Sequence, residues 1–381
     1  MEFRFTDEQQ MIRESAEAFL REQSGPAAVR RAMATEQGFE TALWDQLADA
    51  MGWSAMHIPE EFGGLGLGAV ELVALMEEMG KRLLCAPFFS SVCLGTTAIL
   101  CAATNAQKAA ILPDIAAGSV RATLGWMGDG RDWSPAGISL ACTRHGDGWR
   151  LQGESHYVVD GHTADLLVLA ARLPGEGIRV FAVPASTAGL SREWLPTMDQ
   201  TRKLSKLSLD GVQLGSDALL GLDQDASEAL QKTLDIATIA LAAEQSGVAQ
   251  QVLDMAVAYT KERHQFGRAI ASFQAIKHKA ADMMLKAEAS RSAAYYAACV
   301  ADEALRGGVV GAELAQAASL AKASCSETAF FNAGSAIQMY GGVGFTWEYD
   351  VHLYFKRARA SEAFLGAPAW HRERIAQELG L

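Results

Sequence analysis

The sequence predicts an α+β fold in which an N-terminal helical domain precedes a middle β-barrel or sandwich domain and a C-terminal four-helix bundle. Three observations support this order. Apolar residues recur at helical spacing in residues 1–118, short alternating runs divided by turns fill residues 119–222, and an alanine-rich helical region occupies residues 223–381. We therefore expect domain boundaries near residues 118 and 222.

The N-terminal region contains a clear helix start. Thr6 and Gln9 have the spacing of a capping box, in which each side chain bonds the other residue's backbone N–H group. Apolar residues then follow at helical intervals from Met11 to Leu20. A loop is expected at 58–68, where Pro59 and four glycines interrupt the pattern.

The middle region has the pattern of a sheet. Runs rich in β-branched and apolar residues occur at 149–161, 164–172, 179–185 and 204–214, and the turn sequence LPGEG separates the second run from the third. The region after it is different, because residues 229–264 contain no proline and only one glycine, Gly247. Small residues on several faces of this segment favour long, tightly packed helices, as in a bundle.

Composition limits the possible functions. The formal net charge is −12, from 33 basic and 45 acidic side chains, which disfavours binding to a nucleic-acid backbone. The six cysteines form no CxxC pair and have no metal-ligand spacing with histidine, so we expect reduced thiols and no metal. The N-terminus does not resemble a signal peptide and no run of eighteen apolar residues occurs. These features predict a cytoplasmic protein without a membrane span, although a processed matrix protein would look the same.

Two segments carry most of the functional information. The first is YTKERHQFGRAIASFQAIKHKAADM at 259–283, and the second is QMYGGVGFTWEYDVHLYFKRAR at 338–359. An arginine fork matches phosphate oxygens and keeps its charge, and glycines let backbone N–H groups approach a phosphate closely. Together with the helix–β–helix order, these segments resemble the acyl-CoA dehydrogenase family over nearly the whole chain.

The resemblance implies an oxidoreductase that uses FAD and acts on an acyl-CoA thioester. In the family, the matching residues bind the ADP end of an FAD that the neighbouring subunit holds. The residues of this sequence to which that role is carried over are Arg263, Gln265, Phe266, Gln274, Gln338, Gly341 and Gly342. The alternative is that Arg263 forms a surface ion pair with Glu262 or nearby acids, and that the glycines make only a tight turn between helices.

The family's catalytic base is not found where the resemblance would place it. A carboxylate removes the α-proton of the thioester in this family, and the commonest slot for it falls on Leu365, with Ala367 in the slot of a flavin-contacting threonine. A second slot, near the start of the first C-terminal helix, falls on Ala237. Neither leucine nor alanine can accept a proton, so both slots are empty.

Two other carboxylates are candidates for the base. Glu244 lies seven residues after Ala237, on the same helix face and roughly 10 Å along the axis, and it is the leading catalytic candidate. Its alternative role is a buried helix glutamate that pairs with another side chain. Glu362 is close to the Leu365 slot, but we expect it to pair with Arg359 or another basic neighbour. The family's thioester-binding arginine aligns with Thr238, so no CoA-binding residue is carried over.

The half of the site that would hold the flavin ring is also altered. The family's Thr-Glu-Pro segment is replaced by LGWMGDGRDW at 124–133, and its Trp-Ile-Thr segment by Tyr157, Val158 and Val159. Tyr157 can still stack, but Val159 lacks a hydroxyl. The changes therefore affect this chain's own flavin-ring pocket and leave the residues for a partner's ADP group intact.

Three hypotheses follow from this pattern. The first is a subunit of a heteromeric α2β2 acyl-CoA dehydrogenase, a form that the resemblance associates with bacterial breakdown of steroid side chains and rings. The second is a self-sufficient homotetrameric dehydrogenase with Glu244 as its base. The third is a non-catalytic binding or structural member, including the family's DNA-associated branch, which the net charge disfavours. The resemblance also implies an electron-transfer flavoprotein as acceptor, and fatty-acid or steroid degradation as the setting.

Overall fold

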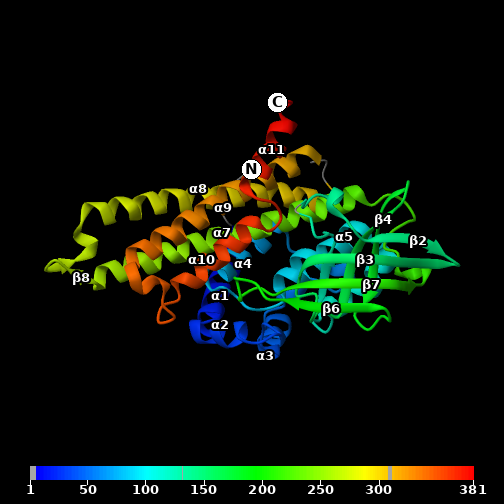
Figure 1. Ribbon diagram of the computed structural model, residues 1–381, viewed down its shortest axis with the longest axis horizontal. Helices are drawn as coiled ribbons and strands as arrows, with labels where there is room; N and C mark the ends of the chain where they lie inside the picture. The colour runs from blue at the N-terminus through cyan, green and yellow to red at the C-terminus, as the bar shows by residue number, and fades with distance from the viewer. Residues whose placement is uncertain (1–5, 131, 308–310) are drawn as a thin grey trace. The chain divides into compact units, whose positions relative to one another are not determined.

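The computed structural model describes residues 6–130, 132–307 and 311–381 of the 381-residue chain, and Figure 1 shows it as a ribbon. The chain divides into two compact units. Unit 1 comprises the N-terminal residues up to Arg30, Ala69–Leu84 and Thr238–Leu381, and unit 2 comprises Arg31–Gly68 and Cys85–Ala237. The division into three consecutive domains stays a prediction.

Unit 1 is helical. Its elements are α1 (Asp7–Gln23), α4 (Ala69–Lys81), most of α7 (Ser227–Glu262), α8 (Gln274–Leu305), α9 (Gly311–Tyr340), α10 (Val351–Ala363) and α11 (Pro368–Glu378). The helix α2 (Pro26–Met33) crosses the boundary between the units. The predicted capping box is confirmed, since Gln9 N donates to Thr6 Oγ1 at 3.2 Å and Thr6 N donates to Gln9 Oε1 at 3.0 Å.

Two glycines allow α4 to contact α7 backbone to backbone. A Cβ at Gly80 of α4 would lie 2.1 Å from the carbonyl oxygen of Glu244, and a Cβ at Gly247 of α7 would lie 1.9 Å from that of Glu77. These separations are far below van der Waals contact, so only glycine fits at either position. The single glycine of the long alanine-rich segment therefore has a packing role, and α4 belongs to the same unit as the C-terminal helices.

Unit 2 contains a sheet with helices from the preceding part of the chain. The sheet order is β1-β4-β2-β3-β7-β6, with β5 paired to β4. The strands are β1 (Ala122–Gly125), β2 (Ala141–His145), β3 (Gly148–Val159), β4 (Leu166–Leu173), β5 (Gly177–Pro184), β6 (Leu190–Leu195) and β7 (Leu204–Leu214). The helices are α3 (Thr41–Asp45), α5 (Thr97–Ala102) and α6 (Asn105–Ala116), together with π-helical η1 (Gln46–Ala50) and η4 (Phe89–Thr96) and short 3₁₀ turns.

The core of unit 2 lies on the sheet. Trp149 of β3 meets Phe181 of β5 edge to face, with ring centroids 5.4 Å apart, among buried leucines of β3, β4 and β7. The four predicted strand runs correspond to β3, β4, β5 and β7. The ladder between β3 and β7 shifts register between Ser155 and Val158, and Tyr157 within this bulge has a φ of 55°.

Candidate functional site

Aromatic stacking joins the two motif segments at one end of unit 1. Tyr259 of α7 stacks on Tyr340 of α9 with ring centroids 4.1 Å apart and planes 11° from parallel. The Tyr259 hydroxyl also donates to the Tyr340 carbonyl at 3.4 Å, and Tyr349 meets both rings edge on. The sequence interpretation missed this contact, although both tyrosines lie inside the quoted motifs. The end of α7 and the turn after α9 are thereby held side by side, near the label β8 in Figure 1.

The first motif forms an exposed hairpin beyond α7. Strands β8 (His264–Gln265) and β9 (Arg268–Ala269) are joined by a tight turn in which Phe266 has a φ of 53° and is 91% exposed. A large apolar side chain in a strained, solvent-exposed turn is costly unless something covers it. The Arg268 guanidinium lies 4.0 Å from the centroid of the Phe273 ring, just before α8 begins at Gln274. Gln265 and Gln274 are also exposed.

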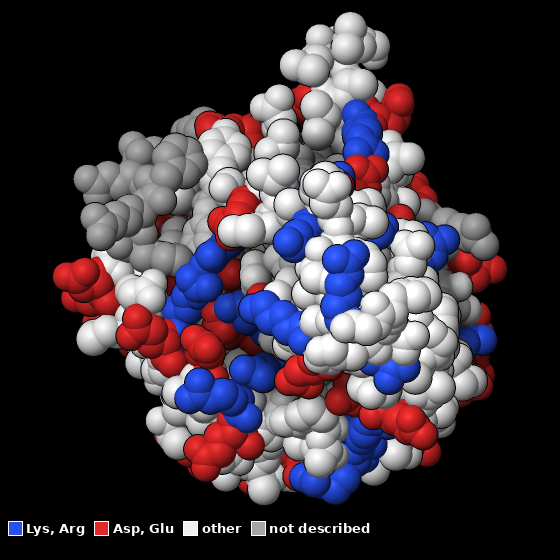
Figure 2. All heavy atoms as spheres, turned by 90° about the vertical axis from the view of Figure 1, so that its left-hand side faces the viewer, with Lys and Arg blue, Asp and Glu red and all other residues white. Residues whose placement is uncertain are grey.

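Arg263 is available to bind an anion. Its side chain is exposed. Among the residues that the structure describes, Arg263 forms no ion pair with Glu262 or with any other acidic side chain. Figure 2 views the molecule from the left-hand side of Figure 1, and Lys and Arg side chains gather across the middle of that face. A chain with a net charge of −12 therefore still presents a locally basic surface.

The second motif supplies open backbone at the end of α9, whose last residue Tyr340 stacks on Tyr259 of α7. The 3₁₀ turn η8 (Gly341–Phe345) follows α9, and Gly341 has a φ of 69° in the left-handed region. A Cβ at Gly341 or Gly342 would meet no other atom within 4 Å, so both glycines face open space. Gln338, one turn earlier, is exposed. Exposed amides, accessible backbone and an unpaired guanidinium fit the ADP end of a dinucleotide.

Glu244 is part of a buried ion pair. Its Oε1 accepts a hydrogen bond of 2.9 Å from a terminal nitrogen of Arg357 on α10, and the two side chains are 5% and 3% exposed. A carboxylate bound in this way is oriented toward α10 by a permanently charged partner. The geometry favours the structural role that sequence reasoning gave as the alternative, while the catalytic assignment of Glu244 stays a prediction.

The Leu365 slot lies in a strained turn between α10 and α11. Leu365 has a φ of 59° and is 3% exposed, and Gly366 has a φ of 99°. His371 Nε2–H donates to the Leu365 carbonyl at 2.9 Å, while its Nδ1 accepts from the hydroxyl of Ser319 at 3.2 Å. Burial lowers the pKa of His371 to about 3, so the imidazole is neutral.

Lys322 holds the same turn from α9. Its fully buried Nζ donates to the carbonyls of Ser361, Glu362 and Gly366 at 3.0, 3.1 and 3.0 Å, and burial lowers its pKa to about 7. The Glu362 side chain pairs with Arg359, as the sequence predicts. Sequence reasoning missed Lys322; the available signal was a lysine inside the apolar run LAKAS. The turn is thus fixed from two helices, although position 365 carries no reactive group.

The altered flavin-ring segments form an aromatic cluster in unit 2. Trp126, just after β1, lies 6.0 Å from Trp133, and Trp133 lies 6.3 Å from Tyr157 in the bulge of β3, measured between ring centroids. Trp126 and Val159 are buried, whereas Tyr157 is partly exposed. Farther along the chain, Ala237 and Thr238 are buried on α7. None of these side chains is a carboxylate.

Other classes of site receive no support from the structure. Among the residues it describes, no cluster of histidine, cysteine or acidic side chains could hold a metal ion. The six cysteines form no disulfide bonds. Within the described ranges, no helix is long and apolar enough to cross a bilayer.

Comparison with known proteins identifies the family. The model of the acyl-CoA dehydrogenase N-terminal domain matches residues 6–119, and that of the C-terminal domain matches residues 227–380. Acyl-CoA dehydrogenase IpdE2 of Mycolicibacterium smegmatis is 32% identical over 374 residues, which cover 98% of this chain and 99% of that protein.

Solved structures agree with this result. Butyryl-CoA dehydrogenase of Megasphaera elsdenii has a TM-score of 0.91 at 25% identity and full coverage of both chains. A chain of the ChsE4–ChsE5 complex of Mycobacterium tuberculosis has a TM-score of 0.89 at 26% identity, covering 100% of this chain and 99% of that one. The protein belongs to the acyl-CoA dehydrogenase family. It is an oxidoreductase that acts on acyl-CoA, and its cofactor is FAD, as the family resemblance implied.

Proposed function

We propose that this chain is one subunit of a heteromeric α2β2 acyl-CoA dehydrogenase, in which it binds the ADP end of an FAD whose ring lies in a partner subunit. One contrast carries the proposal. The exposed end of α7 and α9 keeps an unpaired Arg263 and open glycines, whereas the base slot at Leu365 is apolar and Glu244 is paired with Arg357. A chain with this combination can hold a cofactor but needs a carboxylate from elsewhere.

Each retained residue has a defined task in the proposal. Arg263 binds the pyrophosphate, since a guanidinium makes strong charge-assisted hydrogen bonds to phosphate oxygens. Gly341 and Gly342 let backbone N–H groups approach the same anion, and the amides of Gln265, Gln274 and Gln338 bond the ribose and adenine. The exposed Phe266 covers apolar cofactor or partner surface. FAD, when bound, accepts a hydride from the substrate.

The similarity to components of two-chain assemblies supports this arrangement. One similar structure is the ChsE4–ChsE5 complex, and another is a steroid acyl-CoA dehydrogenase called Tcur3481–Tcur3483, with 30% identity and a TM-score of 0.85. By analogy, the substrate of the present assembly is an acyl-CoA thioester with a steroid-derived or fatty acyl group. An electron-transfer flavoprotein as acceptor stays a prediction from the family.

The test compares the chain alone with the chain co-expressed with a neighbouring acyl-CoA dehydrogenase gene. We expect a colourless protein alone and a yellow, active complex on co-expression. Arg263→Ala should lower the FAD content of the complex, while Arg21→Ala, an exposed arginine on α1, should leave it unchanged. FAD content is read from flavin absorbance after denaturation, independently of activity.

Three results would contradict the proposal. A yellow chain that dehydrogenates acyl-CoA by itself and loses activity as Glu244→Gln, with its fold intact, would establish the homotetrameric alternative. A complex whose FAD content is unaffected by Arg263→Ala would show that the ADP group binds elsewhere. A chain that binds no FAD in any combination would favour the non-catalytic alternative.

A further inference from the structure

Side chains of opposite charge line an open pocket within unit 2. The pocket has a volume of about 740 Å³, and its walls come from α3 and the loop before it, the residues that lead into β1, the loop between β3 and β4, and strand β6. The lining includes the carboxylates of Glu36 and Asp45 and the guanidiniums of Arg121 and Arg192. All of these segments belong to unit 2, and none of them contributes a residue to the proposed ADP-binding end of unit 1.

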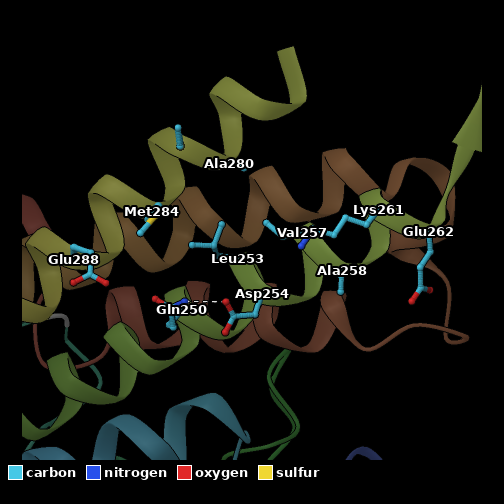
Figure 3. Close-up of a pocket in the computed structure, with 11 residues that line it drawn as sticks. Gln250, Leu253, Asp254, Val257, Ala258, Lys261, Glu262, Ala280, Met284 and Glu288 are labelled. Atoms are coloured by element: carbon cyan, nitrogen blue, oxygen red, sulfur yellow. Dashed lines mark hydrogen bonds between the residues drawn. The ribbon is translucent and has the colours of Figure 1, made fainter. Parts of the chain in front are cut away.

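A groove in unit 1 has a different character (Figure 3). It lies between α7 and α8, has a volume of about 640 Å³, and includes Asp254, which accepts a hydrogen bond of 2.9 Å from Gln250. Lys261 and Glu262 of the first motif segment also line it. The groove is therefore part of the end of unit 1 that the proposed function uses, whereas the pocket of unit 2 has no role in that function.

Arg192 reaches the pocket with its guanidinium fixed but only partly used. Its Nη1 group donates hydrogen bonds to the carbonyls of Gly161 and Ala164, at 3.4 and 2.9 Å. Among the residues that the structure describes, its Nε and Nη2 groups have no hydrogen-bond partner and its side chain forms no ion pair. A guanidinium that two backbone carbonyls hold in place needs little further ordering to bind a carboxylate.

Arg121, the second arginine of the pocket, lies close to the same acidic residue as Arg192. Its Nε and Nη2 groups donate to the two carboxylate oxygens of Asp165, at 2.8 and 3.0 Å. Burial acts to raise the pKa of Asp165, but the hydrogen bonds and charge of Arg121, with the nearby charge of Arg192, hold that pKa below its usual value. Two permanently charged guanidiniums therefore share one carboxylate, and these three groups keep a net positive charge.

Glu36 and Asp45 supply the acidic groups of the pocket. Both side chains are exposed, and across the described part of the chain neither forms an ion pair or a side-chain hydrogen bond. The backbone that carries them is fixed at two points. His162 Nε2–H donates to the Glu36 carbonyl at 2.8 Å, and Trp44 Nε1–H donates to the Gly118 carbonyl at 2.8 Å. The two carboxylates thus line the same pocket as the guanidiniums without pairing with either of them.

We propose that this pocket binds a small amino acid, whose carboxylate contacts Arg192 and whose ammonium group contacts Glu36 and Asp45. A ligand with these complementary charges would replace the water that hydrates each group with charge-assisted hydrogen bonds. A simple anion would be attracted by the arginines and repelled by the two carboxylates, and a simple cation would meet the reverse. A zwitterion satisfies both kinds of charge, and the volume of the pocket leaves room for several carbon atoms between them.

Isothermal titration calorimetry on the chain expressed alone, in a buffer free of zwitterions, tests the site. The ligands are glycine, β-alanine, 4-aminobutanoate and 6-aminohexanoate, which differ only in the separation of their two charges. Hexanoate and hexylamine each carry one of the two charged groups and serve as controls. We expect at least one amino acid to bind with a dissociation constant of about 1 mM or lower, about tenfold or more below the constants of both controls.

Two variants locate the bound ligand. Arg192→Gln should weaken binding of the amino acid about tenfold or more, whereas Arg150→Gln, at an exposed arginine of β3 outside the pocket, should leave it unchanged. E36Q/D45N should reduce the affinity for the amino acid to that for hexanoate, because the preference for an ammonium group is lost. Asp49→Asn, at an exposed acid outside the pocket, should keep that preference.

Three outcomes go against the amino-acid site. If no amino acid binds better than hexanoate and hexylamine, the charges of the pocket are only hydrated surface groups. If hexanoate binds as tightly as the amino acids, the pocket is an anion site and the ligand class is wrong. Binding that Arg192→Gln leaves unchanged would place the ligand elsewhere.

Folding and the proposed function are controlled separately. All the substituted side chains are exposed, so circular dichroism should match the wild type, and if Arg192→Gln fails this check, E36Q/D45N still tests the site. The titrations involve neither FAD nor a partner subunit. The amino-acid site therefore goes beyond the proposed function, and each can fail while the other holds.

Discussion

Removing the carboxylate of Glu244 should destabilise unit 1 much more than it affects chemistry. The Glu244–Arg357 pair has an N–O distance of 2.9 Å between nearly inaccessible side chains. With an effective dielectric constant of 20, the gross attraction is roughly 6 kcal/mol, most of which offsets the desolvation of the two charges. Glu244→Met removes the carboxylate that pairs with the buried guanidinium, and the expected loss in unfolding free energy is about 3–5 kcal/mol.

The assay is urea unfolding followed by far-UV circular dichroism, in a double-mutant cycle. Arg357→Met should cost a similar amount, because it removes the cation that pairs with the buried carboxylate. The double variant E244M/R357M should be more stable than the sum of the two single changes predicts, since two methionines fill the space without charge. Glu244→Gln, which retains a hydrogen-bond acceptor, should cost about 1–2 kcal/mol.

The opposite pattern would refute this reasoning. If Glu244→Gln unfolds at the wild-type urea concentration and yet abolishes dehydrogenation in the reconstituted enzyme, the residue is a base and not a structural partner. Additive effects in the Met–Met cycle would show that the two side chains do not interact in solution. Both outcomes can be distinguished from misfolding. The double-mutant cycle measures the free energy of unfolding, and the turnover assay measures the rate of dehydrogenation.

Three further predictions concern buried groups. Lys322→Met should lower the unfolding free energy by about 3 kcal/mol in urea titrations, since it removes a buried donor to three carbonyls, and Lys322→Arg should not restore it because the larger group does not fit. Gly366→Ala should reduce the thermal unfolding temperature, as its Cβ would lie 2.7 Å from the Trp370 ring at a φ of 99°. Burial lowers the pKa of His57 to about 4 and that of His371 to about 3. The unfolded chain therefore binds more protons than the folded chain below pH 6.5. In urea titrations, the free energy of unfolding should fall by about 2 kcal/mol per histidine between pH 7 and pH 5. His371→Gln should remove the contribution of that histidine to the pH dependence.

The parts of the fold that local patterns determine were predictable. The Thr6 capping box depends on residues three apart, and the strand runs depend on alternation within a few residues, so both were found in the sequence. The α4–α7 contact was not, because Gly80 and Gly247 meet only in three dimensions. Periodicity identifies which face of a helix is apolar but does not identify its partner.

The candidate site shows the same limit. The motif around Arg263 and the apolar residue at 365 are visible in one dimension, and the resemblance gave each a position. The partner of Glu244 is 113 residues away, and Lys322 acts on a turn about forty residues later. Neither contact produces a recognisable spacing in the sequence. Sequence reasoning therefore proposed Glu244 as a base, whereas in the fold its carboxylate forms an ion pair with Arg357.

The Leu365 turn explains how a base can be absent without damage to the surrounding structure. A leucine with a φ of 59° carries a backbone strain of roughly 1 kcal/mol, and such strain persists only where neighbours over-determine the conformation. Here Lys322 and His371 hold carbonyls of the turn through hydrogen bonds to backbone oxygens. These hydrogen bonds do not involve the side chain at position 365. A carboxylate can be exchanged for a leucine at this point while the hydrogen bonds that hold the turn between α10 and α11 are kept, and this agrees with the proposal of a subunit that leaves the chemistry to its partner.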